Sequence, residues 1–190
     1  MRVRLFVAVW PDPAAVEDLD DALAAIRRDH ARQGPRWVAS SRLHVTLVFL
    51  GDLGESYLVP LERELSDALS AQCPFASRLV GGGTFGNRIL WAGLDGADDR
   101  WTPLARASRR AVRAAGASVE SRQWKAHLTV AYGRPGVALD RFTGPLQGYR
   151  GPPFDVTDAS LIRSTLGPNP NYEVLSRFAL GGSIDPLRTD

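Results

Sequence analysis

Hydrophobic and polar positions repeat along the chain with two different periods, which separate expected strands from expected helices. Alternation with a period of two among β-branched and aromatic residues predicts strands, and a period near 3.6 predicts amphipathic helices. The strand pattern covers residues 2–10, 43–50, 75–80, 89–94, 128–132, 159–164 and 174–180. The helical pattern covers residues 13–32, 55–72 and 98–115.

Each expected helix has one apolar stripe that can face a core. The stripes are Val16, Leu19, Leu23 and Ile26 in the first helix, Leu58, Leu61, Leu65 and Leu69 in the second, and Trp101, Leu104, Ala111 and Val112 in the third. Gly81-Gly82-Gly83 predicts a turn between two paired strands, and a loop-rich stretch follows residue 132. Helices and strands alternate irregularly with hairpin-like pairs among them, which favours an α+β fold over a regular parallel α/β fold.

The length and composition narrow the class of protein. A chain of 190 residues fits one domain, residues 1–190, or two small lobes that share a core. Cys73 is the only cysteine, which excludes an internal disulfide framework and a multi-cysteine metal site. The apolar run at the N-terminus is interrupted by Pro11-Asp12, too soon for a signal peptide or a membrane span. We therefore expect a cytoplasmic monomer with no membrane association.

The charge leaves the partner open. The net charge is +2, and Lys125 is the only lysine, so nearly every positive charge is a guanidinium. Guanidinium groups suit phosphate recognition, but a GC-rich genome produces the same bias toward arginine. The charge neither requires nor excludes a nucleic-acid partner.

One tetrapeptide pattern occurs twice, as His44-Val45-Thr46-Leu47 and as His127-Leu128-Thr129-Val130. The chain has three histidines, and two of them begin this pattern. In a strand, alternate side chains point to opposite faces, so each copy places its histidine and threonine on one face and its aliphatic pair on the other. Two such strands facing each other form a clamp with an imidazole on either side.

Phosphoryl transfer can use such a clamp without a cofactor or a metal. In-line displacement places the attacking and leaving oxygens on opposite sides of phosphorus. One neutral histidine can take a proton from water while a protonated one supplies the departing oxygen, and the unperturbed pKa of histidine near neutrality suits both roles. The hydroxyls of Thr46 and Thr129 can donate to the non-bridging oxygens.

A purely structural role for the histidines, or a different catalytic motif, fits the sequence less well. A single His-x-Thr is more often an ordinary strand histidine, but the matched pair indicates a shared site. His30 ends the first expected helix, where a cation favours the helix dipole, and we assign it no chemistry. The sequence has no Gly-x-Ser-x-Gly nucleophile elbow, no phosphate-binding loop with a following lysine, and no histidine, cysteine or carboxylate cluster with zinc-ligand spacing.

The two motifs, about eighty residues apart, resemble those of the two-histidine phosphoesterase superfamily. Within it, the sequence resembles the bacterial and archaeal RNA 2′,3′-cyclic phosphodiesterases, also called 2′-5′ RNA ligases. The resemblance extends to the segments 4–8, 37, 43–51, 161–164, 172 and 178–180, although only the two motif blocks are specific.

This resemblance implies a two-lobed α+β fold with antiparallel-rich sheets, helices on the outside and the motifs facing a central cleft. It also implies that His44 donates a proton, that His127 accepts one, and that Thr46 and Thr129 bind the phosphate. Many relatives place an arginine five residues after the second histidine, where this chain has Tyr132. Arg134 is a candidate phosphate contact only if its strand continues past Gly133.

Three functions remain open. The first is hydrolysis of 2′,3′-cyclic phosphate ends of RNA, such as tRNA fragments, or of small cyclic nucleotides. The second is 2′-5′ end joining by the reverse chemistry, with a ribose hydroxyl replacing water. The third is a nucleotide- or RNA-binding module without turnover. The intact pair of histidines favours an enzyme, because binding does not need two proton-transfer groups.

Overall fold

The computed structural model describes residues 2–121, 123–165 and 171–182. Its helices are α1 (Pro13–Asp29), α2 (Leu58–Ser70) and α3 (Thr102–Ala114). Its strands are β1 (Arg2–Val9), β2 (Arg36–Trp37), β3 (Val45–Gly54), β4 (Phe75–Phe85), β5 (Ile89–Leu94), β6 (Leu128–Tyr132), β7 (Arg150–Val156), β8 (Asp158–Ser164) and β9 (Tyr172–Ala179). The expected α+β class is confirmed.

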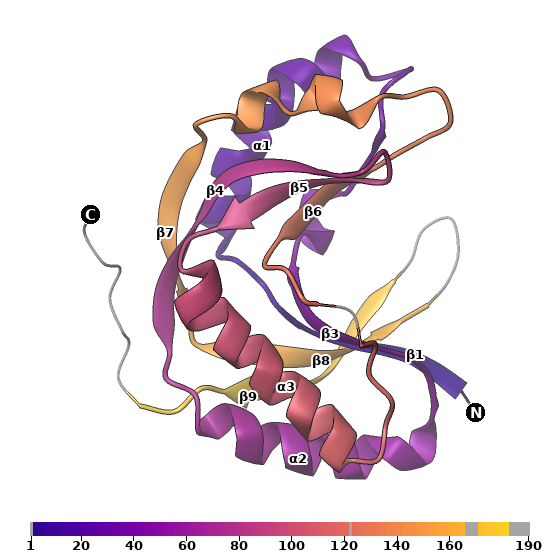
Figure 1. Cartoon of the computed structure of the whole chain (residues 1–190), viewed down its shortest axis with the longest axis vertical. Helices are drawn as coiled ribbons and strands as arrows, with labels where there is room; N and C mark the ends of the chain where they lie inside the picture. Colours follow the sequence, from indigo (N-terminus) through magenta and orange to yellow (C-terminus); the bar gives the residue numbers. More distant parts are fainter. Residues whose placement is uncertain (1, 122, 166–170, 183–190) are drawn as a thin grey trace.

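The nine strands of the described residues form one sheet in the order β7-β4-β5-β6-β3-β1-β8-β9, and the short β2 pairs with β6. Every strand pair is antiparallel. The sheet curls into an open C (Figure 1), so that its two halves form two lobes around a concave side.

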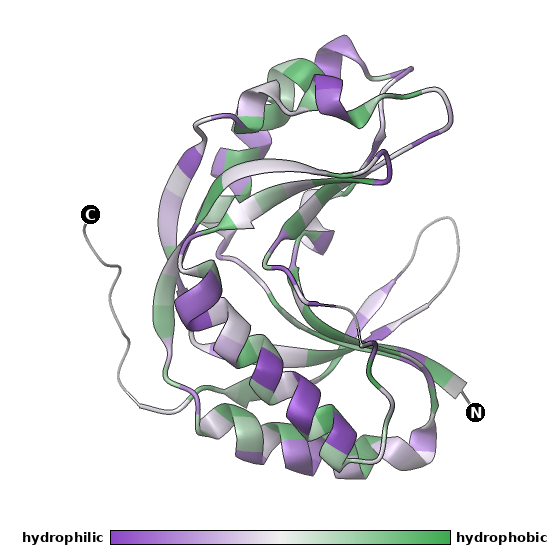
Figure 2. Cartoon of the chain, viewed as in Figure 1, coloured by the Kyte–Doolittle hydropathy of each residue, from purple (hydrophilic) through white to green (hydrophobic). Residues whose placement is uncertain are grey.

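The helices cover the two lobes separately. α1 packs against β7 and β4 of one lobe, whereas α2 packs against β9 and β8 of the other and α3 packs against α2 and β3. The expected stripes supply the contacts, since Leu19, Leu61 and Trp101 are fully buried. Figure 2 shows hydrophilic residues alternating with hydrophobic ones along α3. This pattern is expected for a helix that buries only one face.

The strand ladder of the sheet crosses from one lobe to the other where β3 meets β6, and this crossing is narrow. The two strands share a single pair of residues, Val45 and Leu128. Both side chains are completely buried, because they belong to the aliphatic face of the two repeated motifs. The two histidine motifs therefore lie at the only direct strand contact between β3 and β6 in the described chain.

The turn expected at Gly81-Gly82-Gly83 is wrong. These glycines lie inside β4, which continues to Phe85, and the hairpin turns at residues 86–88 instead. A Cβ atom on Gly82 would lie 2.5 Å from the carbonyl oxygen of Trp91 and 2.9 Å from Cβ of Leu146. Glycine is needed at position 82 because the backbone of Trp91 and the side chain of Leu146 approach too closely for any side chain. Close approach of another backbone is a common reason for glycine inside a strand.

The loop expected after residue 132 contains a strand that the sequence pattern missed. β7 includes Pro152 and Pro153, which lack the N–H group that a central strand needs. β7 lies at the end of the sheet order, and an edge strand tolerates proline because one side of it forms no ladder. Its last residues alternate as expected for a strand, with Phe154 and Val156 buried and Asp155 exposed between them.

Candidate active site

The pairing of Val45 with Leu128 brings the two motifs together as a nearly symmetric arrangement. Extending this antiparallel register by one residue in each direction places His44 opposite Thr129 and Thr46 opposite His127. The two histidines are then diagonal neighbours on one face, a relationship that spans roughly 7–8 Å in a sheet. That spacing leaves room for one phosphate group between two imidazoles.

Both imidazoles are held by the same backbone contact. Nδ1 of His44 lies 2.7 Å from the carbonyl oxygen of Arg42, and Nδ1 of His127 lies 2.7 Å from the carbonyl oxygen of Lys125. A carbonyl oxygen only accepts, so Nδ1 carries the hydrogen in both rings. Nε2 is consequently the nitrogen that gains or loses a proton in each histidine.

The surroundings of His44 are aromatic. Its ring centre lies 5.0 Å from that of Phe6, 5.2 Å from that of Trp10 and 5.5 Å from that of Tyr172. The pKa of His44 is lowered to about 4, mainly because the ring is buried; the hydrogen bond to the Arg42 carbonyl opposes this shift, and the charge of His127 contributes to it. His44 is therefore neutral at neutral pH in the free protein.

Two guanidinium groups lie near Tyr172 on the same side. Burial raises the pKa of Tyr172, with Tyr132 adding to the rise and the charges of Arg42 and Arg36 opposing it. The guanidinium of Arg36 lies over the Tyr132 ring, 4.7 Å from its centre. These arginines supply positive charge near Tyr172, whose ring contacts that of His44.

Tyr132 reaches this face because β6 contains a bulge. Trp91 pairs with Thr129 and Leu90 pairs with Ala131, so Val130 has no partner on β5. A bulge shifts the alternation by one residue, which returns Tyr132 to the face of His127 and Thr129. The sequence pattern gave no sign of this shift.

A second set of contacts anchors the segment that carries His127. Trp124 donates its indole N–H to the carbonyl oxygen of Thr46 over 2.8 Å, which ties this segment to β3. Phe85 contacts His127 edge to face, with the ring centres 4.9 Å apart. The order of these residues along the chain gave no indication of either contact.

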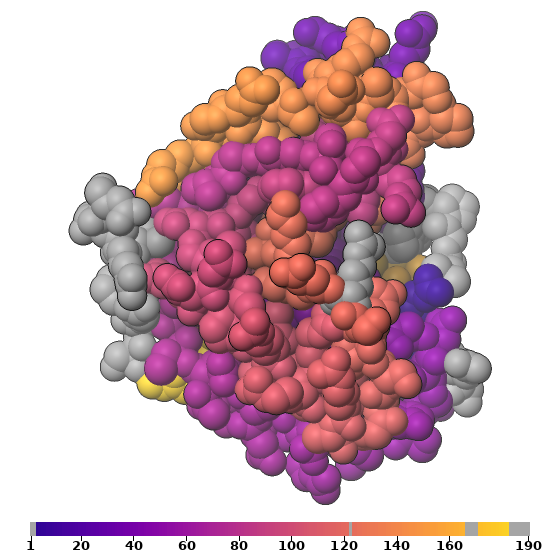
Figure 3. All heavy atoms as spheres, viewed as in Figure 1, coloured from indigo at the N-terminus to yellow at the C-terminus, as the bar shows by residue number. Residues whose placement is uncertain are grey.

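A cavity of about 880 Å³ opens beside the motifs, lined by Thr46, Phe49, Phe85, Arg88, Lys125, His127 and others. Figure 3 shows this face of the molecule, with the segment around residues 123–130 lying between the β4–β5 hairpin and α3. Thr46 and His127 line the cavity, whereas His44 and Thr129 do not. It therefore leads from solvent to one side of the clamp.

The structure places Arg134 and His30 elsewhere. β6 ends at Tyr132, and the chain then passes so close to Asn87 that a Cβ atom on Gly133 would lie 2.2 Å from the Asn87 carbonyl oxygen. Arg134 and His30 line a different cavity of about 650 Å³ between the end of α1 and residues 134–142. The condition for a phosphate contact by Arg134, a strand that continues past Gly133, is not met.

The site offers proton transfer and hydrogen bonding. No group of three or more histidine, cysteine, aspartate or glutamate side chains that could hold a metal ion exists among the residues described. In the same part of the chain, no helix is long and apolar enough to cross a membrane.

Comparison with known proteins agrees with this geometry. The sequence model of the 2′-5′ RNA ligase superfamily matches residues 10–168, which include both motifs. The chain belongs to this superfamily. A protein of Methanothermobacter thermautotrophicus named RNA 2′,3′-cyclic phosphodiesterase is 31% identical over 95% of this chain and 100% of its own length.

Two further proteins extend the comparison. A Geobacillus stearothermophilus protein with the same name is 31% identical over 78% of the chain, and the match spans about half of that relative, 49% of its length. The crystal structure of Escherichia coli LigT complexed with 3′-AMP has the same fold, with a TM-score of 0.76, 22% identity, and coverage of 95% of this chain and 99% of that one.

Proposed function

We propose that this protein hydrolyses 2′,3′-cyclic phosphate ends of RNA to 2′-phosphomonoesters. The observation that carries the proposal is the junction of β3 and β6, which brings two equally oriented imidazoles to one face. Relatives that share about 30% of their residues with the chain are named for this activity.

In the proposed reaction, water attacks phosphorus and the bond from phosphorus to O3′ breaks. His127 takes the proton of the attacking water at Nε2, and His44 gives a proton from Nε2 to the departing O3′. Thr46 and Thr129 donate hydrogen bonds to the non-bridging oxygens, where negative charge concentrates. Both proton transfers are assigned to imidazoles, so no step requires a metal ion.

The low pKa of His44 adds a condition to this assignment. A donor must be protonated, yet the free protein holds His44 neutral at neutral pH. The negative charge of a bound phosphate favours the imidazolium form and raises this pKa. We therefore expect His44 to take up a proton when the substrate binds.

The test is turnover of an RNA oligonucleotide that ends in a 2′,3′-cyclic phosphate, measured with EDTA present. We expect hydrolysis to the 2′-phosphate, with His44→Ala and His127→Ala each reducing kcat/KM by about 10²–10⁴-fold. The double variant should lose less than the product of the single losses, because both histidines act in one transition state. Absence of turnover by the wild-type protein would refute the function, and loss of turnover on chelation would refute metal independence.

A sulfur substitution separates the two histidine roles. A substrate with sulfur in place of O3′ has a leaving group that departs as a thiolate and needs little help from an acid. We expect His44→Ala to lose much less activity on this substrate than on the oxygen substrate, and His127→Ala to lose the same on both. The opposite pattern would exchange the assigned roles.

End joining through a 2′-5′ bond is the second candidate, because the superfamily carries that activity in its name. It uses the same residues with a ribose hydroxyl in place of water. Water at about 55 M favours hydrolysis unless the second RNA end is held at a high effective concentration. We expect ligated product to be minor when both products are measured from one cyclic-phosphate substrate.

A further inference from the structure

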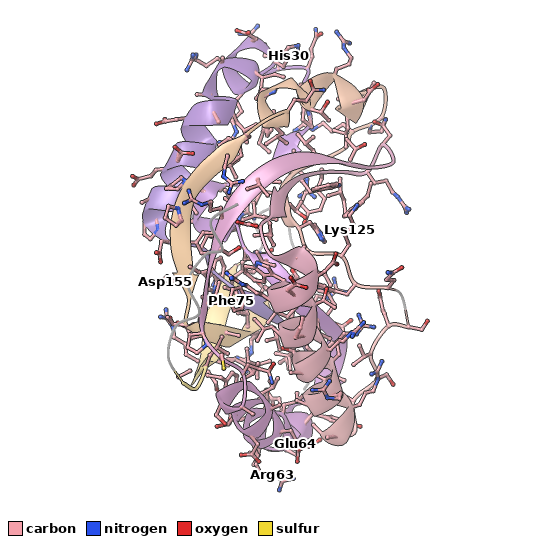
Figure 4. All side chains as sticks on the ribbon, turned by 60° about the vertical axis from the view of Figure 1, so that its left-hand side comes forward. His30, Arg63, Glu64, Phe75, Lys125 and Asp155 are labelled. Atoms are coloured by element: carbon pink, nitrogen blue, oxygen red, sulfur yellow. The ribbon has the colours of Figure 1, made fainter. Side chains whose placement is uncertain are left out.

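Lys125, the only lysine of the chain, lies beside the proposed active site and is held there by two aromatic rings. Its Nζ atom lies 5.4 Å from the centre of the Phe85 ring and 4.8 Å from the centre of the Trp91 ring. The two rings stack on each other with their centres 5.3 Å apart. Figure 4 shows Lys125 below the β4–β5 hairpin and well away from His30 at the end of α1.

The Phe85 ring links this lysine to the proposed catalytic centre. Because the Phe85 ring centre lies 4.9 Å from that of His127 and 5.4 Å from Nζ of Lys125, the ammonium and the imidazole are at most about 10 Å apart. One nucleoside bridges such a distance. The lysine is thus placed for a second group of the substrate, beyond the group held between the histidines.

The contacts of Lys125 leave its hydrogen-bonding capacity available. Contacts with ring faces stabilise the positive charge and do not use the three N–H donors of the ammonium. None of the ion pairs found among the described residues involves Lys125. An exposed ammonium that is oriented by aromatic rings, with no carboxylate partner in this part of the chain, suits an anionic ligand.

The cavity directs such a ligand toward the lysine. Lys125 and Arg88 line the part of the cavity built by the β4–β5 hairpin and the segment before His127. On the opposite wall, Arg109 of α3 donates to the backbone carbonyl oxygen of Glu120. The carboxylates of Asp98, in the π-helix Ala97–Trp101 before α3, and of Glu120, in the segment after α3, outnumber this one guanidinium and repel an anion. A phosphate that extends from the histidines is therefore drawn along the hairpin wall.

We propose that Lys125 binds the phosphate on the 5′ side of the terminal nucleoside. This inference rests on the proposed function and names the substrate class of the same site. An RNA end with a 2′,3′-cyclic phosphate carries its next phosphate on O5′ of the same ribose, whereas a nucleoside 2′,3′-cyclic phosphate has none. Lys125 selects RNA ends and 5′-phosphorylated nucleotides over the unphosphorylated nucleoside.

The test compares adenosine 2′,3′-cyclic phosphate with the same molecule carrying a 5′-phosphate. We expect the wild-type protein to prefer the 5′-phosphorylated substrate by about 10-fold in kcat/KM, the usual effect of one charge-assisted hydrogen bond. Lys125→Met should remove most of this preference, and Lys125→Arg should retain it. Arg106→Met, which removes an exposed positive charge of α3 outside the cavity, should keep both activities and the preference.

A preference that Lys125→Met leaves unchanged would overturn the inference while leaving the proposed function intact. Absence of turnover of both mononucleotides and of the RNA oligonucleotide would overturn the proposed function. In that case calorimetry with adenosine 2′-phosphate and adenosine 2′,5′-bisphosphate still decides the inference. Wild-type protein should bind the bisphosphate about 10-fold more tightly and Lys125→Met should not, and equal binding by the wild-type protein would refute it.

Discussion

The two imidazoles share one orientation but differ in their surroundings. The carbonyl oxygens of Arg42 and Lys125 hold both rings by Nδ1, so Nε2 is the nitrogen that can exchange a proton in each motif. His44 lies among the rings of Phe6, Trp10 and Tyr172, and His127 lies against Phe85 at the cavity. The motifs match in sequence, but their imidazoles have unequal surroundings because residues outside the motifs differ.

This inequality predicts how the histidines titrate. In an NMR titration of the three histidines, His44 should titrate at about pH 4, and adenosine 2′-phosphate should raise this value. Trp10→Ala should move the pKa of His44 toward 6.5, because it admits water to the ring. The His44 resonance is the one that disappears in His44→Gln. A pKa near 6.5 for His44 in the wild-type protein would show that burial does not determine this pKa.

The same burial predicts a pH dependence of stability. Between pH 6.5 and 4 the unfolded chain binds a proton on His44 and the folded protein does not, so the free energy of unfolding falls as the pH falls. The shift from 6.5 to about 4 corresponds to up to about 3 kcal/mol. Urea unfolding across this range should show a smaller loss for His44→Gln, and equal losses would contradict the prediction.

At the scale of elements, the sequence predicted the helices and strands whose structure depends mainly on their own residues. β5 and β6 begin and end at the expected residues, and α1 begins at Pro13. The triglycine segment and β7 were misassigned, because their structure depends on distant partners: Leu146 closes over Gly82, and the sheet edge accommodates Pro152 and Pro153.

The site residues also divide into those that local sequence predicts and those that depend on distant parts of the chain. The repeated motif predicted which four residues gather, since alternation fixes their common face. It could not predict Tyr172, which comes from the other end of the sheet order, or the bulge that turns Tyr132 toward His127. It left Arg134 conditional on a strand that continues past Gly133, and β6 ends at Tyr132, where the chain passes close to Asn87.

The close approach at Gly82 predicts the effect of a single methyl group. Gly82→Ala should lower the free energy of unfolding by about 1–3 kcal/mol, because the new Cβ meets the Trp91 carbonyl and Leu146. Gly144→Ala is the matched control, since no atom lies within 4 Å of its added Cβ, and it should change stability by about 0.5 kcal/mol or less. Denaturant unfolding of both variants measures the difference, and equal stabilities would refute the steric role of the triglycine segment.

At the scale of the whole molecule, the sheet passes from one lobe to the other through a single residue pair of β3 and β6, and the proposed catalytic groups lie on either side of it. β3, on the α2–α3 side, follows His44 and carries Thr46, whereas β6, in the α1 lobe, follows His127 and carries Thr129. The pairing of Val45 with Leu128 therefore sets the spacing between the proposed acid and the proposed base. Stability and catalytic geometry depend on the same buried contact.

Leu128→Ala and Leu61→Ala test this dependence, because both remove a completely buried leucine side chain. Each should lower the free energy of unfolding by about 2–5 kcal/mol. Leu61 lies on α2, away from the motifs, so its variant should keep the wild-type kcat under conditions where it is folded. Leu128→Ala relaxes the junction and should lower kcat by about 10–100-fold in the folded protein, since a displacement of about 1 Å in a catalytic group has that effect. Steady-state rates at a temperature where circular dichroism shows both variants folded give the comparison, and equal kcat values would show that the junction does not set the spacing of the histidines.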